Sequence, residues 1–350
     1  MGKLESADIR GSIAAEDGPE HAVYVYISLH DDLRWWLLVL SLLIACPSYA
    51  DTVLVTLEKD NALAVVDDDA MELTRTVKIG RRPRDIKLSP DYRKLYVAAS
   101  DDDTIQVLDG DTYKIIGDLP SGDDPETFAI DPKGERMYVS NEDDNQVTVI
   151  DLASGEVVKT IPVGVEPEGI AVSPDGRWVV STSETTNMAH WIDTQTLEIA
   201  HNTLVDPRPR AATFTADSKQ LWVTSEIGST LTVIDASSQQ EVKKLHFKIP
   251  GVTQELIQPV GVVVDSRRRY GYVALGPANR VAVVDAQKLE VVKYLLTGQR
   301  VWHLAFADDG KRLYTTNGTS HDVTVIDTAR LKPIKSIPVG HYPWGVAVKP

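Results

Sequence analysis

The sequence contains little of several residue types, and each shortage argues against a kind of structure or partner. A single cysteine, Cys46, occurs in 350 residues, which excludes an internal disulfide and a cysteine-based metal cluster. Phe is scarce, while Val is abundant and Gly and Pro recur regularly, a composition that favours strands and turns over helices. Basic residues are outnumbered, with 36 Lys and Arg against 51 Asp and Glu, and the formal net charge is −15. Because an acidic body repels phosphate backbones, we expect no nucleic-acid partner.

Long hydrophobic runs are also rare, and the main one lies near the N-terminus. It follows Arg34 and covers 35–46, which is too short to span a bilayer but suits the core of a signal peptide. "SYA" (48–50) is a small-x-small cleavage site, whereas "LIAC" (43–46) fits a lipoprotein box with a lipid on Cys46. We favour cleavage after Ala50, because a predicted strand begins at once and leaves almost no tether.

The segment before this run is polar and acidic, unlike the basic start of a signal peptide. We therefore expect 1–32 to be a non-native extension, with translation starting at Leu33 through an alternative start codon, and 33–50 to be the signal peptide. The protein is then periplasmic or secreted, with no membrane span.

The sequence is rich in internal repeats. A framing proline recurs every 42 residues, replaced once by Val and interrupted once by eight extra residues: Pro83, Pro125, Pro167, Pro209, Pro259, Val301 and Pro343. A column of aspartates has the same spacing and the same single expansion: Asp67, Asp109, Asp151, Asp193, Asp235, Asp285 and Asp327. Such a period indicates a repeat architecture.

Each repeat reads as four short strands separated by turns. In the third repeat, "TFAID", "RMYVS", "QVTVI" and "EVVKTIPVG" alternate apolar and polar residues between Gly, Pro, Asp and Asn. Four strands in about 42 residues are typical of a propeller blade. We therefore predict an all-β, seven-bladed β-propeller over 51–350, with blades 343–350 plus 51–82, 83–124, 125–166, 167–208, 209–258, 259–300 and 301–342. The C-terminal strand closes the first blade, which removes an open sheet edge.

The words "YVSN", "SPDG", "VTVID" and "IPVG" make the chain resemble the YVTN-type β-propeller repeat proteins over 51–350. It looks most similar to the exported seven-repeat group that accompanies pyrroloquinoline-quinone-dependent alcohol catabolism. The resemblance implies a partner such as a periplasmic quinoprotein dehydrogenase or a transporter component. It says little about function, because propellers host many unrelated activities.

Residues that recur in every blade are expected to be scaffold, so we look for function where the repeat breaks. The position after the framing residue should lie at the mouth of the central channel, and it reads Arg84, Glu126, Glu168, Arg210, Val260, Trp302 and Trp344. The first residue of the polar turn between the second and third strands reads Glu58, Ser100, Glu142, Glu184, Glu226, Gly276 and Gly318. His303 and His341 stand beside this set. The mixed polar and aromatic mouth predicts a ligand site made of Arg84, Glu126, Glu168, Arg210, Trp302, His303, His341 and Trp344.

The expected ligand is pyrroloquinoline quinone or another anionic small molecule. Arg84 and Arg210 would pair with its carboxylates, and Trp302 or Trp344 would stack on its ring. The alternative is that these side chains are only solvated or packed. Glu142, Glu184 and Glu226 offer oxygen ligands for a hard cation but lie on different blades, so we predict no metal site. Haem binding lacks a clear axial pair.

These observations favour an exported, non-catalytic binding or scaffold protein. One alternative is a propeller enzyme, of lactonase or lyase type, using His303, His341 or a Glu as acid and base at the channel mouth. No G-x-S-x-G word supports it. Another is a structural cell-envelope interaction protein. The eight extra residues fall within 247–261, where they form a lid over the mouth, a contact for a partner or a plain loop extension.

Overall fold

The computed structural model describes residues 51–350. The expected extension 1–32, the signal peptide 33–50 and the alternative lipid site Cys46 lie outside the described residues. Within 51–350, no helix is both long enough and apolar enough to cross a membrane.

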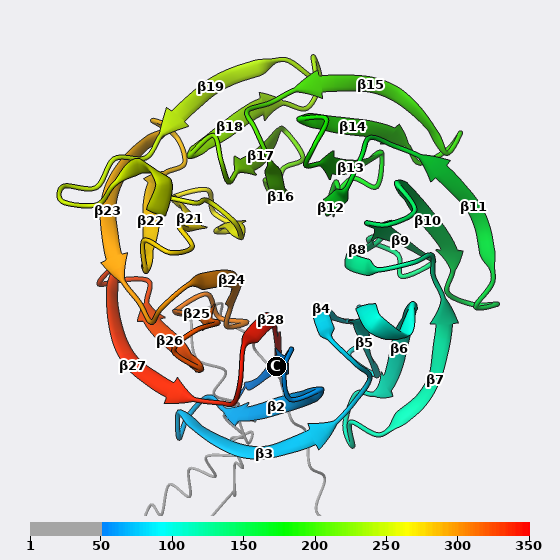
Figure 1. Ribbon diagram of the computed structural model, residues 1–350, viewed down its shortest axis with the longest axis horizontal. Coiled ribbons are helices and arrows are strands. Elements are labelled where there is room, and N and C mark those ends of the chain that lie inside the picture. Colours follow the sequence, from blue (N-terminus) through cyan, green and yellow to red (C-terminus); the bar gives the residue numbers. More distant parts are fainter. Residues whose placement is uncertain (1–50) are drawn as a thin grey trace, which may run out of the picture. The chain divides into compact units, whose positions relative to one another are not determined.

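Seven four-stranded antiparallel sheets form a ring around a central channel (Figure 1), which confirms the predicted seven-bladed β-propeller. The inner strands are β28 (Pro343–Lys349), β4 (Pro83–Leu88), β8 (Pro125–Ile130), β12 (Pro167–Val172), β16 (Pro209–Phe214), β20 (Val262–Val264) and β24 (Val301–Phe306). The second strands are β1 (Thr52–Leu57), β5 (Lys94–Ala99), β9 (Arg136–Asn141), β13 (Trp178–Ser183), β17 (Gln220–Ser225), β21 (Tyr270–Ala274) and β25 (Arg312–Asn317).

The two remaining strands of each blade lie toward the outside. The third strands are β2 (Ala62–Asp67), β6 (Thr104–Asp109), β10 (Gln146–Asp151), β14 (Met188–Asp193), β18 (Thr230–Asp235), β22 (Arg280–Asp285) and β26 (Asp322–Asp327). The outer strands are β3 (Glu72–Lys78), β7 (Ile115–Pro120), β11 (Val157–Pro162), β15 (Glu198–Leu204), β19 (Glu241–His246), β23 (Glu290–Leu296) and β27 (Lys332–Pro338). Two short 3-10 turns, η1 (Ser100–Asp102) and η2 (Gln254–Leu256), complete the described elements.

The C-terminal strand joins the N-terminal sheet, as the repeat count predicts. β28 pairs antiparallel with β1, with Thr52 opposite Lys349 and Leu54 opposite Ala347. The first blade therefore has the order β28-β1-β2-β3, and both ends of the propeller belong to one sheet. This pairing leaves the ring without a free edge between its first and last blades.

The core lies between blades rather than within one. The two middle strands of each blade are buried on both faces, because a neighbouring sheet packs on each side. One large cluster joins Trp222 of β17 to Val273 of β21. The aromatic column on the second strands is fully or almost fully buried, as expected for packing between blades: Tyr96, Tyr138, Trp222, Tyr272 and Tyr314.

The aspartate column closes the turn after the third strand. The Asp151 carboxylate accepts hydrogen bonds from the backbone N–H groups of Ala153 (3.1 Å) and Ser154 (2.8 Å). At Asp235, the same bonds and the hydroxyls of Ser237 and Ser238 lower the pKa to about 2. These carboxylates hold turns, so they belong to the scaffold.

A second set of equivalent residues, at the position before the framing residue, links consecutive blades. In every blade except the sixth, the residue before the framing position adopts a left-handed conformation, and its N–H donates to a side chain of the preceding blade, as from Arg82 to Asn61 (3.0 Å) and from Arg300 to Asn279 (2.8 Å). At the joint between the last and first blades, His321 replaces the asparagine, and its Nδ1 accepts the Tyr342 N–H at 3.2 Å. His321 itself has φ 61°.

Replacing His321 with Asn is therefore expected to preserve or raise stability, because Asn tolerates φ > 0 and supplies the same acceptor. His321→Ala should cost about 1 kcal/mol, because it loses the acceptor and strains the turn. Urea unfolding of the two variants checks this. Equal midpoints for His321→Ala and His321→Asn would contradict it.

The eight extra residues pack on the fifth and sixth blades. Ile249 and Ile257 are buried in the cluster between these blades, and Gln254 donates a side-chain hydrogen bond to the Phe247 carbonyl (3.2 Å). The loop after β19 projects from the outer edge of the ring (Figure 1), and of 247–261 only Gly261, which directly precedes β20, borders either cavity described below. This position gives the lid interpretation no support.

Candidate functional site

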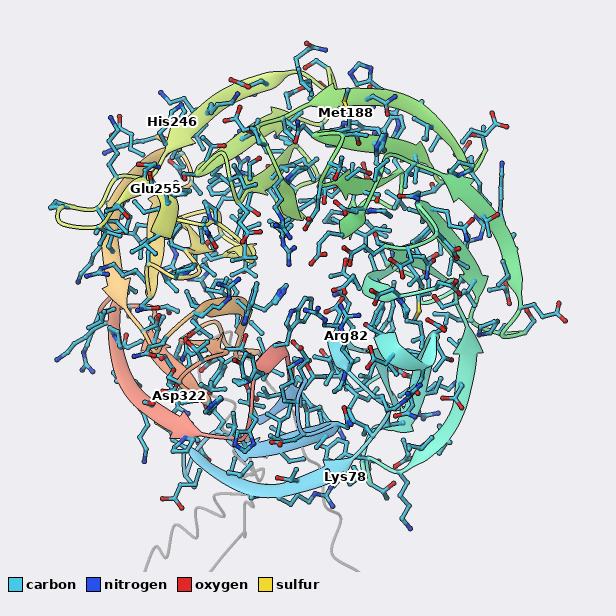
Figure 2. All side chains as sticks on the ribbon, in the orientation of Figure 1. Lys78, Arg82, Met188, His246, Glu255 and Asp322 are labelled. Atoms are coloured by element: carbon cyan, nitrogen blue, oxygen red, sulfur yellow. The ribbon has the colours of Figure 1, made fainter. Side chains whose placement is uncertain are left out.

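Charged side chains from several blades meet at the end of the channel where the inner strands begin. Figure 2 shows side chains of this region, including Arg82, extending toward the centre of the ring. They come from three positions in each repeat: the residue before the framing position, the residue after it and the first turn residue. We name this set the charged layer: Glu58, Arg82, Arg84, Asp124, Glu126, Glu142, Glu168, Glu184, Arg208, Arg210 and Glu226.

Arg210 is the centre of one half of the charged layer. Its guanidinium is only 9% exposed and bonds to Glu168 at 2.8 Å and to Glu184, with Glu226 at 3.7 Å. Arg208 bonds to Glu184 (2.8 Å) and Glu226 (3.2 Å) from the solvent side. Three buried carboxylates thus share two guanidinium groups, and Arg210 is the deeper of the two.

Arg82 and Arg84 organise the other half. Arg82 bonds to Asp124 and to Glu126, both at 2.7 Å. Arg84 lies 3.4 Å from Glu126 and 3.7 Å from Glu58. The arginines expected to bind an anion are therefore already paired with carboxylates of the protein.

The aromatic side chains lie against these arginines. Trp344 is fully buried, with the Arg84 guanidinium 5.2 Å from its ring centre and the His303 ring at 4.0 Å. Trp302 stacks with Arg300, whose guanidinium lies 4.5 Å from its ring centre. Gly318 makes room for it, since a Cβ there would lie 2.5 Å from the Trp302 Nε1.

The charged layer holds more carboxylates than guanidinium groups. Burial raises the pKa of Glu126 to about 7 and that of Glu168 to about 8, even though arginines lower both. Burial and the neighbouring acids Glu168, Asp124 and Glu184 raise the pKa of Glu142 to about 7. Some of these groups therefore carry protons near neutral pH.

The stability of the protein should consequently fall as pH rises from 7 to 9. The folded state holds protons on Glu126, Glu142 and Glu168 that the unfolded state has already released, so each unit of pH favours unfolding. His190 and His303, whose pKa values burial lowers, are already neutral in this window. Urea unfolding at pH 7, 8 and 9 measures the slope.

Glu142→Gln should make stability depend less on pH between 7 and 9. The substitution removes a carboxyl group whose pKa is raised and which has no ion pair among the described residues. The exposed Glu135→Gln serves as control and should leave the slope unchanged. A slope that is flat in the unaltered protein, or equal in both variants, would contradict this account.

The structure brings most of the predicted site residues together, with one exception. His341 lies outside the layer with its side chain 66% exposed, its Nδ1 2.8 Å from Asp60 and its ring near His321. Of the glutamates considered for a metal, Glu184 and Glu226 bond to Arg208. Oxygens of Asp124, Glu126 and Glu142 lie within 4.8 Å of one another, but Arg82 occupies two of these carboxylates and supplies the positive charge there.

A large cavity lies in the channel beside the charged layer, and we name it the channel cavity. It has a volume of about 700 Å³ and is bordered by the inner strands of all seven blades. Arg210 and His303 border one end, and the exposed turn residues Pro90, Tyr92 and Pro174 border the other. A smaller cavity of about 350 Å³ lies beside Glu142 and Arg208.

Two charged residues of the channel cavity, Asp85 and Lys87, were missed by the sequence analysis. Lys87 occupies a column that is otherwise small or apolar: Ala129, Ala171, Thr213, Val263, Ala305 and Ala347. His303 and Asp85 belong to a column that also contains Gly169, Ala211, Gly261 and Gly345. The sequence analysis compared the repeats only at the residue after the framing residue. A comparison at every position of the inner strand would have shown that Asp85 and Lys87 depart from the repeat.

Comparison with known proteins places the fold among propellers. The family described as the cytochrome d1 haem domain matches residues 90–203, about a third of the chain. No curated protein matches the chain. Hydrazine synthase from Kuenenia stuttgartiensis matches with a TM-score of 0.73 and 23% identity, over 79% of this chain and 92% of that chain.

Two further structures are similar in fold. The dihydro-haem d1 dehydrogenase NirN has a TM-score of 0.64 and 16% identity, over 85% of this chain and 74% of that one. A Bacteroides fragilis protein assigned as a 6-phosphogluconolactonase has a TM-score of 0.74 and 16% identity, over 87% and 99% of the two chains. At these identities the structures establish fold alone, and the YVTN-type resemblance stays a prediction. The chain is a seven-bladed β-propeller with local sequence similarity to the cytochrome d1 haem domain.

Proposed function

We propose that the protein is an exported, non-catalytic binding protein that takes a small molecule into its channel cavity and serves pyrroloquinoline-quinone-dependent alcohol catabolism. The observation that carries the proposal is the channel cavity itself, about 700 Å³, with Arg210, His303 and Lys87 on its lining. Concave sites with a few polar groups are typical ligand sites. The resemblance to exported repeat proteins supports the cellular context.

Native mass spectrometry of the protein purified from the periplasm of its own cells tests the proposal. The expected spectrum shows a chain that begins at Asp51 and carries a small molecule. An attached quinoprotein dehydrogenase or transporter subunit would support the proposed partners. A bare chain after gentle purification, together with no ligand captured from a cell extract, would favour a purely structural cell-envelope role.

Pyrroloquinoline quinone is the first ligand to test. Because Arg84 and Arg210 are paired with glutamates, the ligand is expected in the channel cavity and not on the stacked Trp302 and Trp344. Titration calorimetry should detect heat, and the melting temperature should rise at saturation. Absence of both would exclude this quinone as the ligand.

Haem binding is a second candidate, favoured by the local match to the cytochrome d1 haem domain. Within that match, His190 does not fit as an axial ligand, because Asn202 and the Gly164 N–H engage its two nitrogens. His303 fits better: burial and nearby cations lower its pKa to about 3, and no described residue bonds to its imidazole. A Soret band on adding haemin, lost in His303→Ala, would support this candidate, and an unchanged haemin spectrum would exclude it.

The enzyme alternative draws on the fold similarity to the 6-phosphogluconolactonase alone, because the pKa of His303, which burial and nearby cations lower to about 3, makes its imidazole a weak base. His303→Ala and His341→Ala should then abolish a lactonase or lyase activity. If both variants retain any activity found, these histidines are not its acid or base.

A further inference from the structure

Polar side chains from several blades border the channel cavity, and two of them, His303 and Lys87, lie on the blades next to β28. His303 lies on β24 and Lys87 on β4, which are the inner strands on either side of β28. At the equivalent positions β28 carries Gly345 and Ala347. Two polar side chains thus flank a strand that is small at these two positions, and we name this part of the cavity the β28 niche.

Small residues are the rule in the His303 column because the next blade is close. A Cβ on Gly169 would lie 2.4 Å from the Arg210 carbonyl, and one on Gly261 would lie 2.5 Å from the Trp302 carbonyl. A larger side chain at such a position has to pack on the residue of the next blade. His303 does so with its ring on Trp344 at 4.0 Å, and it also borders the channel cavity.

The two side chains are equipped to donate hydrogen bonds. Lys87 donates one hydrogen bond to the Asp85 carboxylate. That carboxylate also accepts hydrogen bonds from the backbone N–H groups of Ile86 (2.9 Å) and Phe128 (3.1 Å). The ammonium has further hydrogens to offer. His303 has no hydrogen-bond partner among the described residues, and its ring N–H is free.

The charges around the niche are mixed, because Lys87, Arg210 and Arg84 are each paired with a carboxylate of the protein. The charged groups that lower the pKa of His303 are Lys87, Arg210 and Arg84, all cations. Backbone groups add polarity to a lining whose side chains are mostly apolar: each inner strand is the edge of its sheet and pairs with one neighbour only, so unpaired backbone groups face the channel. A purely aliphatic molecule would strip water from those groups at a cost.

We propose that the β28 niche binds a carboxylate group of a small polar molecule, with Lys87 and His303 as its hydrogen-bond donors. The proposal rests on the proposed binding function and names its ligand class and recognition residues. Neither Arg84 nor the tryptophans take part, since their contacts are within the protein. A charge-assisted hydrogen bond from Lys87 would provide most of the discrimination against neutral analogues.

The test is titration calorimetry of the purified protein with lactate, citrate and pyrroloquinoline quinone, and with lactamide as the neutral match of lactate. At least one acid should bind, and lactamide should bind at least about tenfold more weakly than lactate. Lys87→Met and His303→Gln should each weaken binding of the acid about tenfold, at a temperature where circular dichroism shows both variants to be folded. Lys94→Met, an exposed lysine outside the cavity, is the matched control.

Binding of the acids that is equal in Lys87→Met, His303→Gln and the control would overturn the assignment of the niche, as would binding of lactamide as tight as lactate. Failure of all three acids to bind would also overturn it. A neutral or cationic molecule retained in native mass spectrometry would then leave the proposed function intact, so the two failures are distinguishable.

Discussion

Removal of residues 343–350 is expected to leave the protein unable to close its ring and largely insoluble. These residues contain β28, the inner strand of the first blade, and without it β1 loses its partner on that side and presents a free edge. Trp344 is fully buried, and truncation of a buried Trp alone costs about 3–5 kcal/mol. The total loss therefore approaches the whole stability of a typical domain, about 5–15 kcal/mol.

Soluble yield and the thermal unfolding curve of the truncated chain measure this effect. Deletion of the exposed Pro350 alone, which lies outside β28, is the matched control and should behave as the unaltered protein. A circular permutant that joins Pro350 to Asp51 through an Asp-Gly pair and opens the exposed turn after Lys133 should fold. A truncated chain that melts within a few degrees of the control would show that β28 does not hold the ring.

Arg210→Met is expected to destabilise the protein by about 3–5 kcal/mol at pH 8, because it leaves buried glutamates without their deepest cation. At pH 6 the loss should be smaller. Protonation relieves the repulsion there, and the pKa of Glu168 is already raised to about 8 with Arg210 present. Urea unfolding at both pH values gives the difference.

Arg208→Met is the control for Arg210→Met. Arg208 bonds to two of the same glutamates, but its side chain is 44% exposed, so water can replace part of its role. A second comparison is Arg210→Met combined with Glu168→Gln, which should recover part of the lost stability. Equal losses for the two arginines, or equal losses at pH 6 and pH 8, would contradict a buried role for Arg210.

Much of the fold followed from the sequence because a propeller is repetitive. Framing residues such as Pro83 and turn aspartates such as Asp151 recur at a fixed spacing, so each blade supports the interpretation of the others. The final eight residues matched only the inner strand of a blade, which predicted closure of the ring by both ends. The structure pairs β28 with β1 accordingly.

The candidate site was less predictable, because its chemistry depends on which charges meet across blades. Arg84 and Arg210 looked available for an anion, yet they pair with Glu126, Glu168 and Glu184 from other repeats. His341 looked close to the channel mouth and instead bonds to Asp60. Neighbours in the ring lie about 40 residues apart in the chain, so side-chain direction decides these contacts.

The sequence alone determined the number of blades, the order of their strands and the closure of the first blade, because local patterning and turn chemistry repeat in every unit. The tertiary structure alone decided that the predicted arginines neutralise buried glutamates and that Lys87 and His303 flank the small residues of β28. The reason is physical. Strand patterns are set by residues within one repeat, whereas charge pairing and cavity lining are set by side chains from different blades that meet only once the ring has closed.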